Sequence, residues 1–184
     1  MGGGEDLPSR NASKEKEIVV CVLPWPEEAA KRGIDDLKKE YKDAEVHYYN
    51  SKFENGKMHP IDIPEDLLKR ASYLATLFWL PSSASAIPNV KAIQFFSAGT
   101  NHVAKHPIYT DSKIPLCSAN GVHGPQIAEW VVMMDLVQSH NYVNLWEQQK
   151  KKEWKQSMGM SVSDRVGKRV GILGYGSIGR QGKP

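Results

Sequence analysis

The sequence predicts an α/β protein built on a flavodoxin-like, doubly wound parallel sheet, followed by the first strand and glycine turn of a Rossmann domain. Short apolar runs rich in β-branched or aromatic residues alternate with polar helical stretches, which is the pattern of βαβ units. The 184 residues allow one full core and a remnant of a second. A composition of 40% hydrophobic and 24% charged residues is typical of a globular protein.

The first elements follow a polar segment, residues 1–16, that we expect to be a disordered tail. Residues 18–23 are all apolar and predict a strand that is buried on both faces. Pro26 opens a helix that runs to about Lys42, with acidic residues at its positive end. Residues 46–49 predict a second strand.

The rest of the sheet lies beyond a loop, residues 50–64, whose Asn, Gly and Pro content predicts no regular structure. A helix over residues 65–71 leads to a third strand within 72–80. Two more strands are predicted within 91–99 and 114–120. Right-handed crossovers place the helices on both faces of the five-stranded sheet.

A long helix is predicted from residue 124 to about 157, because no breaker follows Pro125. Its first half is apolar almost all round and its second half is polar, which suits a helix that connects two domains. We expect the tryptophans of this region, like Trp79, to be packing residues.

A glycine turn follows an apolar run, residues 169–173, that predicts a sixth strand. Gly174 permits a tight turn, Gly176 lets the backbone approach a pyrophosphate, and Gly179 lets the next helix lie close. Ser177 and Ile178 offer main-chain N–H groups at the helix start. The motif predicts binding of NAD or NADP, and the acidic residue that would separate the two, about 20 residues further on, is absent from the chain.

Several other kinds of site and partner are disfavoured. A net charge of +3 from 24 basic and 21 acidic residues gives no basic surface for nucleic acid. The start of the chain has no apolar leader segment, so we expect a cytoplasmic protein with no membrane partner. His102 and His106 lie four residues apart, but no third ligand accompanies them, so we interpret them as surface histidines and predict no metal site.

Two stretches, "FFSAGTNHVAKHPIYTDSKIPLCSANGVHGPQIAEWVV" and "VGKRVGILGYGSIGRQ", resemble the D-isomer-specific 2-hydroxyacid dehydrogenases, the family of glyoxylate reductases and phosphoglycerate dehydrogenase. The resemblance runs from about residue 18 to 181. It implies a substrate domain over 17–123, an interdomain helix over 124–157 and the start of an NAD(P)-binding Rossmann domain over 168–184. It also implies hydride transfer between a nicotinamide and a 2-oxo or 2-hydroxy acid, and a homodimer.

The resemblance assigns the substrate carboxylate to the N–H groups of Ala98 and Gly99. The small side chains of residues 97–99, at the carboxyl end of a predicted strand, favour the same assignment. The family's catalytic Arg, Glu and His all follow the glycine turn, and no residue here takes their place. Arg180 lies within the helix after the turn, and His123 precedes the cofactor domain.

We therefore expect an inactive fragment of the enzyme, with no catalytic residues of its own. The alternative is a non-catalytic flavodoxin-like interaction module that pairs with full-length subunits. A strand over 169–173 has no predicted neighbour, so we expect the last sixteen residues to be poorly packed or to borrow a sheet edge. The closing "GKP" suggests read-through into an intron, and hence a truncated gene product.

Overall fold

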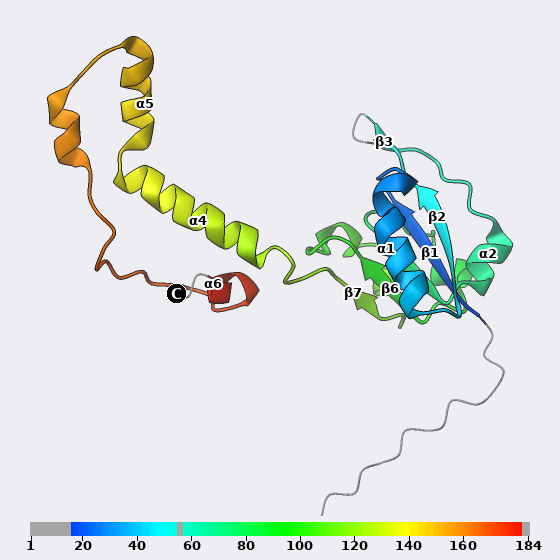
Figure 1. Cartoon of the computed structure of the whole chain (residues 1–184). Coiled ribbons are helices and arrows are strands. Elements are labelled where there is room, and N and C mark those ends of the chain that lie inside the picture. Colours follow the sequence, from blue (N-terminus) through cyan, green and yellow to red (C-terminus); the bar gives the residue numbers. More distant parts are fainter. Residues whose placement is uncertain (1–15, 55–56, 182–184) are drawn as a thin grey trace, which may run out of the picture. The chain divides into compact units, whose positions relative to one another are not determined.

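The computed structural model describes residues 16–54 and 57–181, and the chain divides into two compact units, Met1–Ala119 and Asn120–Pro184. Figure 1 shows the elements of both units. The first unit contains β1 (Glu17–Leu23), α1 (Glu27–Glu40), β2 (Ala44–Asn50), β3 (Phe53–Glu54), β4 (Lys57–Met58), α2 (Glu65–Arg70), β5 (Tyr73–Thr76), η1 (Ala84–Ala86), β6 (Ala92–Phe95), η2 (Asn101–Val103), α3 (Pro107–Thr110) and β7 (Leu116–Cys117). The second contains α4 (Gly124–Ser139), α5 (Tyr142–Lys151), η3 (Gln156–Ser161) and α6 (Ser177–Gln181).

The first unit is built on a five-stranded sheet in the order β2-β1-β5-β6-β7, with every neighbouring pair parallel. This confirms the predicted α/β class and its flavodoxin-like strand order. The loop predicted to be irregular contains a short antiparallel ladder, β3 with β4, in which Phe53 pairs with Met58. Two residues per strand give too little periodicity for such a ladder to be recognised in the sequence.

One face of the sheet, which we call the packed face, carries the hydrophobic core. Val20 pairs with Leu74, and Leu74 with Ile93, so these side chains form one row across three strands. All three are almost completely buried. The core is completed by side chains from the neighbouring strands, helices and loops: Ile18, Val22, Ile63, Leu67, Leu68, Ala71, Ile87, Val90, Phe95, Val103 and Ile108.

The opposite face, which we call the α1 face, is only partly covered. Its row Cys21, Ala75, Gln94 and Cys117 alternates with the core residues along each strand. The helix α1 packs against this side of the sheet, yet none of its residues is buried. A cavity of about 1060 Å³ lies between them. Beyond Cys21 and the rest of that row, the sheet residues lining it include Val19, Leu23, Tyr73, Ala92 and Phe96.

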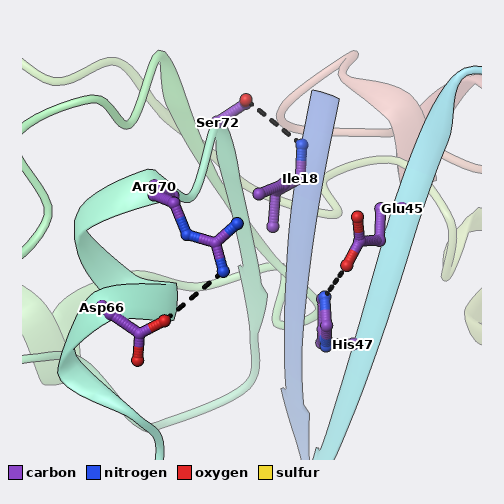
Figure 2. A network of polar contacts seen from close by, with 6 residues as sticks. All are labelled: Ile18, Glu45, His47, Asp66, Arg70 and Ser72. Carbon is purple, nitrogen blue, oxygen red and sulfur yellow. Dashed lines mark hydrogen bonds and ion pairs between the residues drawn. The ribbon is translucent and has the colours of Figure 1, made fainter. Parts of the chain in front are cut away.

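Polar contacts join β1 to the segment before β5. The N–H of Ile18 donates to the Ser72 hydroxyl at 3.2 Å (Figure 2). In the same view an ion pair joins Asp66 and Arg70 at 3.4 Å, and a hydrogen bond joins the side chains of Glu45 and His47 at 2.7 Å, both at exposed positions. Exposed pairs contribute little free energy, so the sheet depends mainly on its core.

The second unit differs from the predicted single helix over 124–157. The helix is interrupted at Asn141, whose φ of 50° lies in the left-handed region, and it continues as α5. Asn tolerates this conformation better than most residues do. The left-handed conformation interrupts the ladder of helical hydrogen bonds between α4 and α5. Asp135 of α4 pairs with Arg165 at 2.7 Å.

Among the described residues, no helix has the length and apolar character that a membrane crossing requires.

The tryptophans only partly meet expectation. Trp79 is half-buried and packs against the core of the first unit, as predicted. Trp130 and Trp154 are 57% and 91% exposed, so the prediction that they pack is wrong for this structure. Their own unit supplies no core that could cover them, because its described buried residues are small or polar.

The predicted sixth strand is not formed. Residues 169–173 have no strand assignment, and Val170 and Leu173 are 79% and 102% exposed. A strand requires a neighbour for its N–H and C=O groups, and none pairs with this segment in the described residues. The expectation of poor packing is confirmed for residues 169–173. Residues 182–184, and residues 1–15 of the expected tail, lie outside the described part.

Candidate functional site

The carboxyl ends of the parallel strands meet at one edge of the sheet, where open α/β sheets bind ligands. The strand β6 ends at Phe95, and the loop of residues 96–100 follows it there. Gly99 is exposed, and a Cβ placed on it would meet nothing within 4 Å. The backbone of this loop is therefore open to a ligand.

Hydrogen bonds hold the carbonyl groups of this loop and leave two N–H groups available. The Ser97 hydroxyl donates to the Gly99 carbonyl at 2.8 Å, and the Ala119 N–H donates to the Ser97 carbonyl at 2.9 Å. Within the part of the chain that the structure describes, the N–H groups of Ala98 and Gly99 donate to no acceptor. Two adjacent free donors at a strand end suit a carboxylate.

Aromatic rings surround the same loop. Phe96 meets Trp25, which follows β1, with ring centroids 6.0 Å apart. His102 lies edge-on to Phe78 at 5.7 Å and to the buried Phe95 at 5.6 Å. The backbone donors are thus flanked by aromatic side chains, of which Trp25, Phe78 and Phe96 are exposed.

The two histidines predicted to lie on the surface have separate structural roles. Nδ1 of His106 accepts a hydrogen bond from the Ile108 N–H at 3.2 Å and so caps α3. His102 instead makes the ring contacts described above. Across residues 16–54 and 57–181, no group of three potential ligands could hold a metal ion. Pro107, directly after His106, stands at the first turn of α3, where proline is typical of a helix start.

The glycine turn adopts the local geometry that the motif requires. Gly174 has a φ of +90°, which a residue with a side chain rarely adopts. A Cβ on Gly179 would lie 2.4 Å from the Gly174 carbonyl oxygen, so only glycine permits this close approach. A Cβ on Gly176 would meet nothing within 4 Å, which leaves its backbone open.

The helix α6 begins at Ser177, so the N–H groups of Ser177 and Ile178 lie at its amino end. The first N–H groups of a helix have no intrahelical acceptor. Arg180 folds back on the turn, with its Nε donating to the Gly176 carbonyl at 3.3 Å. The predicted turn and helix are therefore present, while the strand that should precede them is not.

The fold is shared with solved enzymes. A phosphoglycerate oxidoreductase from Rhizobium etli matches 90% of this chain at 17% identity and a TM-score of 0.57, over 50% of its own length. A D-isomer-specific 2-hydroxyacid dehydrogenase from Xanthobacter autotrophicus, in complex with NADPH and MES, matches 89% of the chain at 18% identity and a TM-score of 0.58, over 48% of its length. A D-lactate dehydrogenase from Aquifex aeolicus, complexed with NAD and lactic acid, matches 89% at 18% identity and a TM-score of 0.50, over 46% of its length.

The chain shares its fold with about half of a D-isomer-specific 2-hydroxyacid dehydrogenase. It spans about half the length of the solved structures that it matches. No family model and no curated protein matches the sequence. The structural match agrees with the resemblance that the two sequence stretches indicated.

Proposed function

We propose that this chain carries the substrate-binding part of an NAD(P)-dependent D-2-hydroxyacid dehydrogenase. The observation that carries the proposal is the pair of free N–H groups on Ala98 and Gly99, at the carboxyl edge of the sheet. They would hold the carboxylate of a 2-oxo or 2-hydroxy acid. The lactic acid in the Aquifex aeolicus complex belongs to the same chemical class.

The glycine turn fits the start of a dinucleotide site. Gly176 leaves room for a pyrophosphate at the backbone, and Gly179 brings α6 against the turn. Ser177 and Ile178 would then donate their N–H groups to the phosphate oxygens. The nicotinamide of NAD or NADP, when bound, supplies or accepts the hydride that interconverts a 2-oxo and a 2-hydroxy acid.

The residues named above would bind and orient a carboxylate. The resemblance assigns the proton transfer that accompanies hydride transfer to an Arg, a Glu and a His that follow the glycine turn, so the proposal covers binding of the carboxylate alone.

The proposal is tested by titrating the labelled protein with lactate or pyruvate and following amide shifts by NMR. Shifts should concentrate on residues 97–100, and lactamide, which lacks the carboxylate, should not produce them. Ala98→Pro removes one donor and should weaken binding by about tenfold or more, whereas Ala98→Val keeps the N–H and should bind nearly as the wild type does. Equal binding by both variants, in folded protein, would contradict the proposal.

The alternative, a non-catalytic interaction module, is favoured by one observation. Several large apolar side chains of α4 are exposed, and those of Trp130, Val131 and Val132 are more than half exposed. Exposed apolar surface of this kind marks a site of protein association. A module of this sort would bind a full-length dehydrogenase subunit and give no carboxylate-dependent shifts at residues 97–100.

A further inference from the structure

The Ser97 side chain bonds the loop that carries the two free N–H groups. Its hydroxyl donates to the Gly99 carbonyl at 2.8 Å, so the contact reaches over Ala98 to the second residue along the chain. Serine hydroxyls form such local bonds to the backbone where the chain leaves regular structure. Ser97 does not belong to the hydrophobic core of the first unit. The bond therefore shapes the loop without contributing to core packing.

The two ends of the loop are fixed by backbone hydrogen bonds. The Phe96 N–H donates to the Thr76 carbonyl at 2.8 Å, which ties the start of the loop to the end of β5. The Val103 N–H donates to the Thr100 carbonyl at 3.0 Å, which fixes the end of the loop in η2. The stretch that the Ser97 hydroxyl spans lies between these two anchors.

The direction of the Ala98 N–H follows from the planar trans peptide, in which the N–H and the C=O point in opposite directions. The Ser97 carbonyl accepts from the Ala119 N–H at 2.9 Å. Because the Ala98 N–H belongs to the same peptide unit as this carbonyl, it points away from Ala119. One donor of the proposed carboxylate site is thus oriented by a backbone bond, without the Ser97 side chain.

The Gly99 carbonyl is a group that would disfavour an anion. An ionised carboxylate only accepts hydrogen bonds, so it requires donors and is repelled by an oxygen that turns toward it. The Gly99 carbonyl belongs to the same residue as one of the two free N–H groups. The Ser97 hydroxyl occupies this carbonyl oxygen, which leaves the N–H groups of Ala98 and Gly99 as the groups that an anion would meet.

We propose that Ser97 is a positioning residue of the carboxylate site: its hydroxyl holds the Gly99 carbonyl oxygen away from the anion and fixes the loop in the form that binds it. This inference rests on the proposed function and adds to it a residue that acts through the backbone. Threonine carries the same hydroxyl as serine, whereas alanine has none. The two substitutions therefore separate the hydroxyl from the rest of the side chain.

Titration with lactate, followed by the amide shifts of residues 97–100, measures the contribution of Ser97. Ser97→Ala should raise the dissociation constant of lactate about fivefold, the effect expected of one hydrogen bond. Ser97→Thr should bind within about twofold of the wild type, because it keeps the donor. Ser83→Ala is the matched control, because it removes a serine hydroxyl that bonds Ser85 instead, and it should bind as the wild type does. Circular dichroism would show that the variants fold.

The Gly99 carbonyl gives a readout that a general loss of stability would not reproduce. In the free protein, its carbonyl carbon shift should change in Ser97→Ala, where the hydrogen bond is lost. It should stay close to the wild-type value in Ser97→Thr. The carbonyl shift therefore reports the bond itself, and the titration reports what the bond does for binding.

The outcomes distinguish this inference from the function on which it rests. A wild type without carboxylate-dependent shifts would overturn the proposed function and the role of Ser97 with it. A wild type that binds lactate, beside a folded Ser97→Ala of equal affinity, would overturn the role of Ser97 alone. The same conclusion would follow if Ser97→Thr kept the wild-type carbonyl shift but bound lactate as weakly as Ser97→Ala.

Discussion

The two units of this chain differ in what their apolar side chains contact. In the first unit, Phe95, Leu74 and Ile93 are almost completely buried in one contiguous core. In the second, the residues described as buried are Gly124, Ser139 and Gln148, and none of these is a large apolar residue. The first unit is therefore held together by hydrophobic burial. The second has no buried large apolar residue among its described residues, and its segments are joined by polar contacts such as the Asp135–Arg165 ion pair.

Two similar sequences show the cause of the difference. The apolar run at residues 18–23 becomes β1, which has a parallel neighbour on each side. The run at residues 169–173, apolar except for Arg169, precedes the glycine turn but pairs with no strand in the described residues. The pattern of an apolar strand is sufficient only where neighbouring strands accept its hydrogen bonds.

The sharpest test of this contrast is truncation of one apolar side chain in each unit. Phe95→Ala removes a completely buried ring and should lower the free energy of unfolding by about 3–5 kcal/mol. Leu173→Ala removes a completely exposed side chain and should change it by less than about 0.5 kcal/mol. Urea denaturation followed by circular dichroism measures both. Similar losses for the two variants would show that the second unit has a core of its own.

The sequence predicted the five-stranded sheet of the first unit well because most of its strands carry short apolar or aromatic runs, and each of them has a neighbour to pair with. The ends of the strands were less accurate. A strand was predicted within residues 72–80, yet β5 ends at Thr76. The buried Thr76 hydroxyl donates to the Trp79 carbonyl at 2.8 Å, which turns the chain away from the sheet. A contact of this kind depends on the folded loop and leaves no periodic signal.

The candidate site was predictable in its residues but not in its hydrogen bonding. Small side chains at residues 97–99, and the resemblance, pointed to Ala98 and Gly99. Only the folded loop, where the Ser97 hydroxyl binds the Gly99 carbonyl, shows that the N–H groups of these two residues have no acceptor among the described residues. Carboxylate binding by these groups stays a prediction.

The two cysteines of the α1 face differ in burial. Cys21, on the inner strand β1, is buried, and Cys117, on the edge strand β7, is exposed. Burial raises the pKa of the Cys21 thiol from 9.0 to about 11. Between pH 9 and pH 11 the thiol loses its proton in the unfolded chain but keeps it in the folded chain. The free energy of unfolding therefore keeps its full value below pH 9 and falls as the pH rises toward 11. At pH 10.5 this loss should reach about 2 kcal/mol.

Urea midpoints of the wild type and of Cys21→Ala, compared at pH 8 and pH 10.5, measure this effect. The wild type should lose more stability than the variant by that amount. Burial also raises the pKa of Tyr48, and this contribution cancels in the difference because both proteins carry the tyrosine. Cys117→Ser, at the exposed position, should follow the wild type. If Cys21→Ala and the wild type lose equal stability, the Cys21 thiol is open to water in solution.

The smallest effect is expected at the helix starts. Two histidines, one in each unit, directly precede a helix and can be compared. His106 caps α3 through its ring nitrogen, whereas His123, before α4, makes no side-chain cap hydrogen bond. His106→Ala should therefore lower the free energy of unfolding by about 0.5–1 kcal/mol, because the Ile108 N–H loses its acceptor. His106→Asn should restore most of that loss, and His123→Ala should change the stability by less than about 0.3 kcal/mol. Equal losses from the two alanine variants would mean that the contrast between the units does not extend to their helix ends.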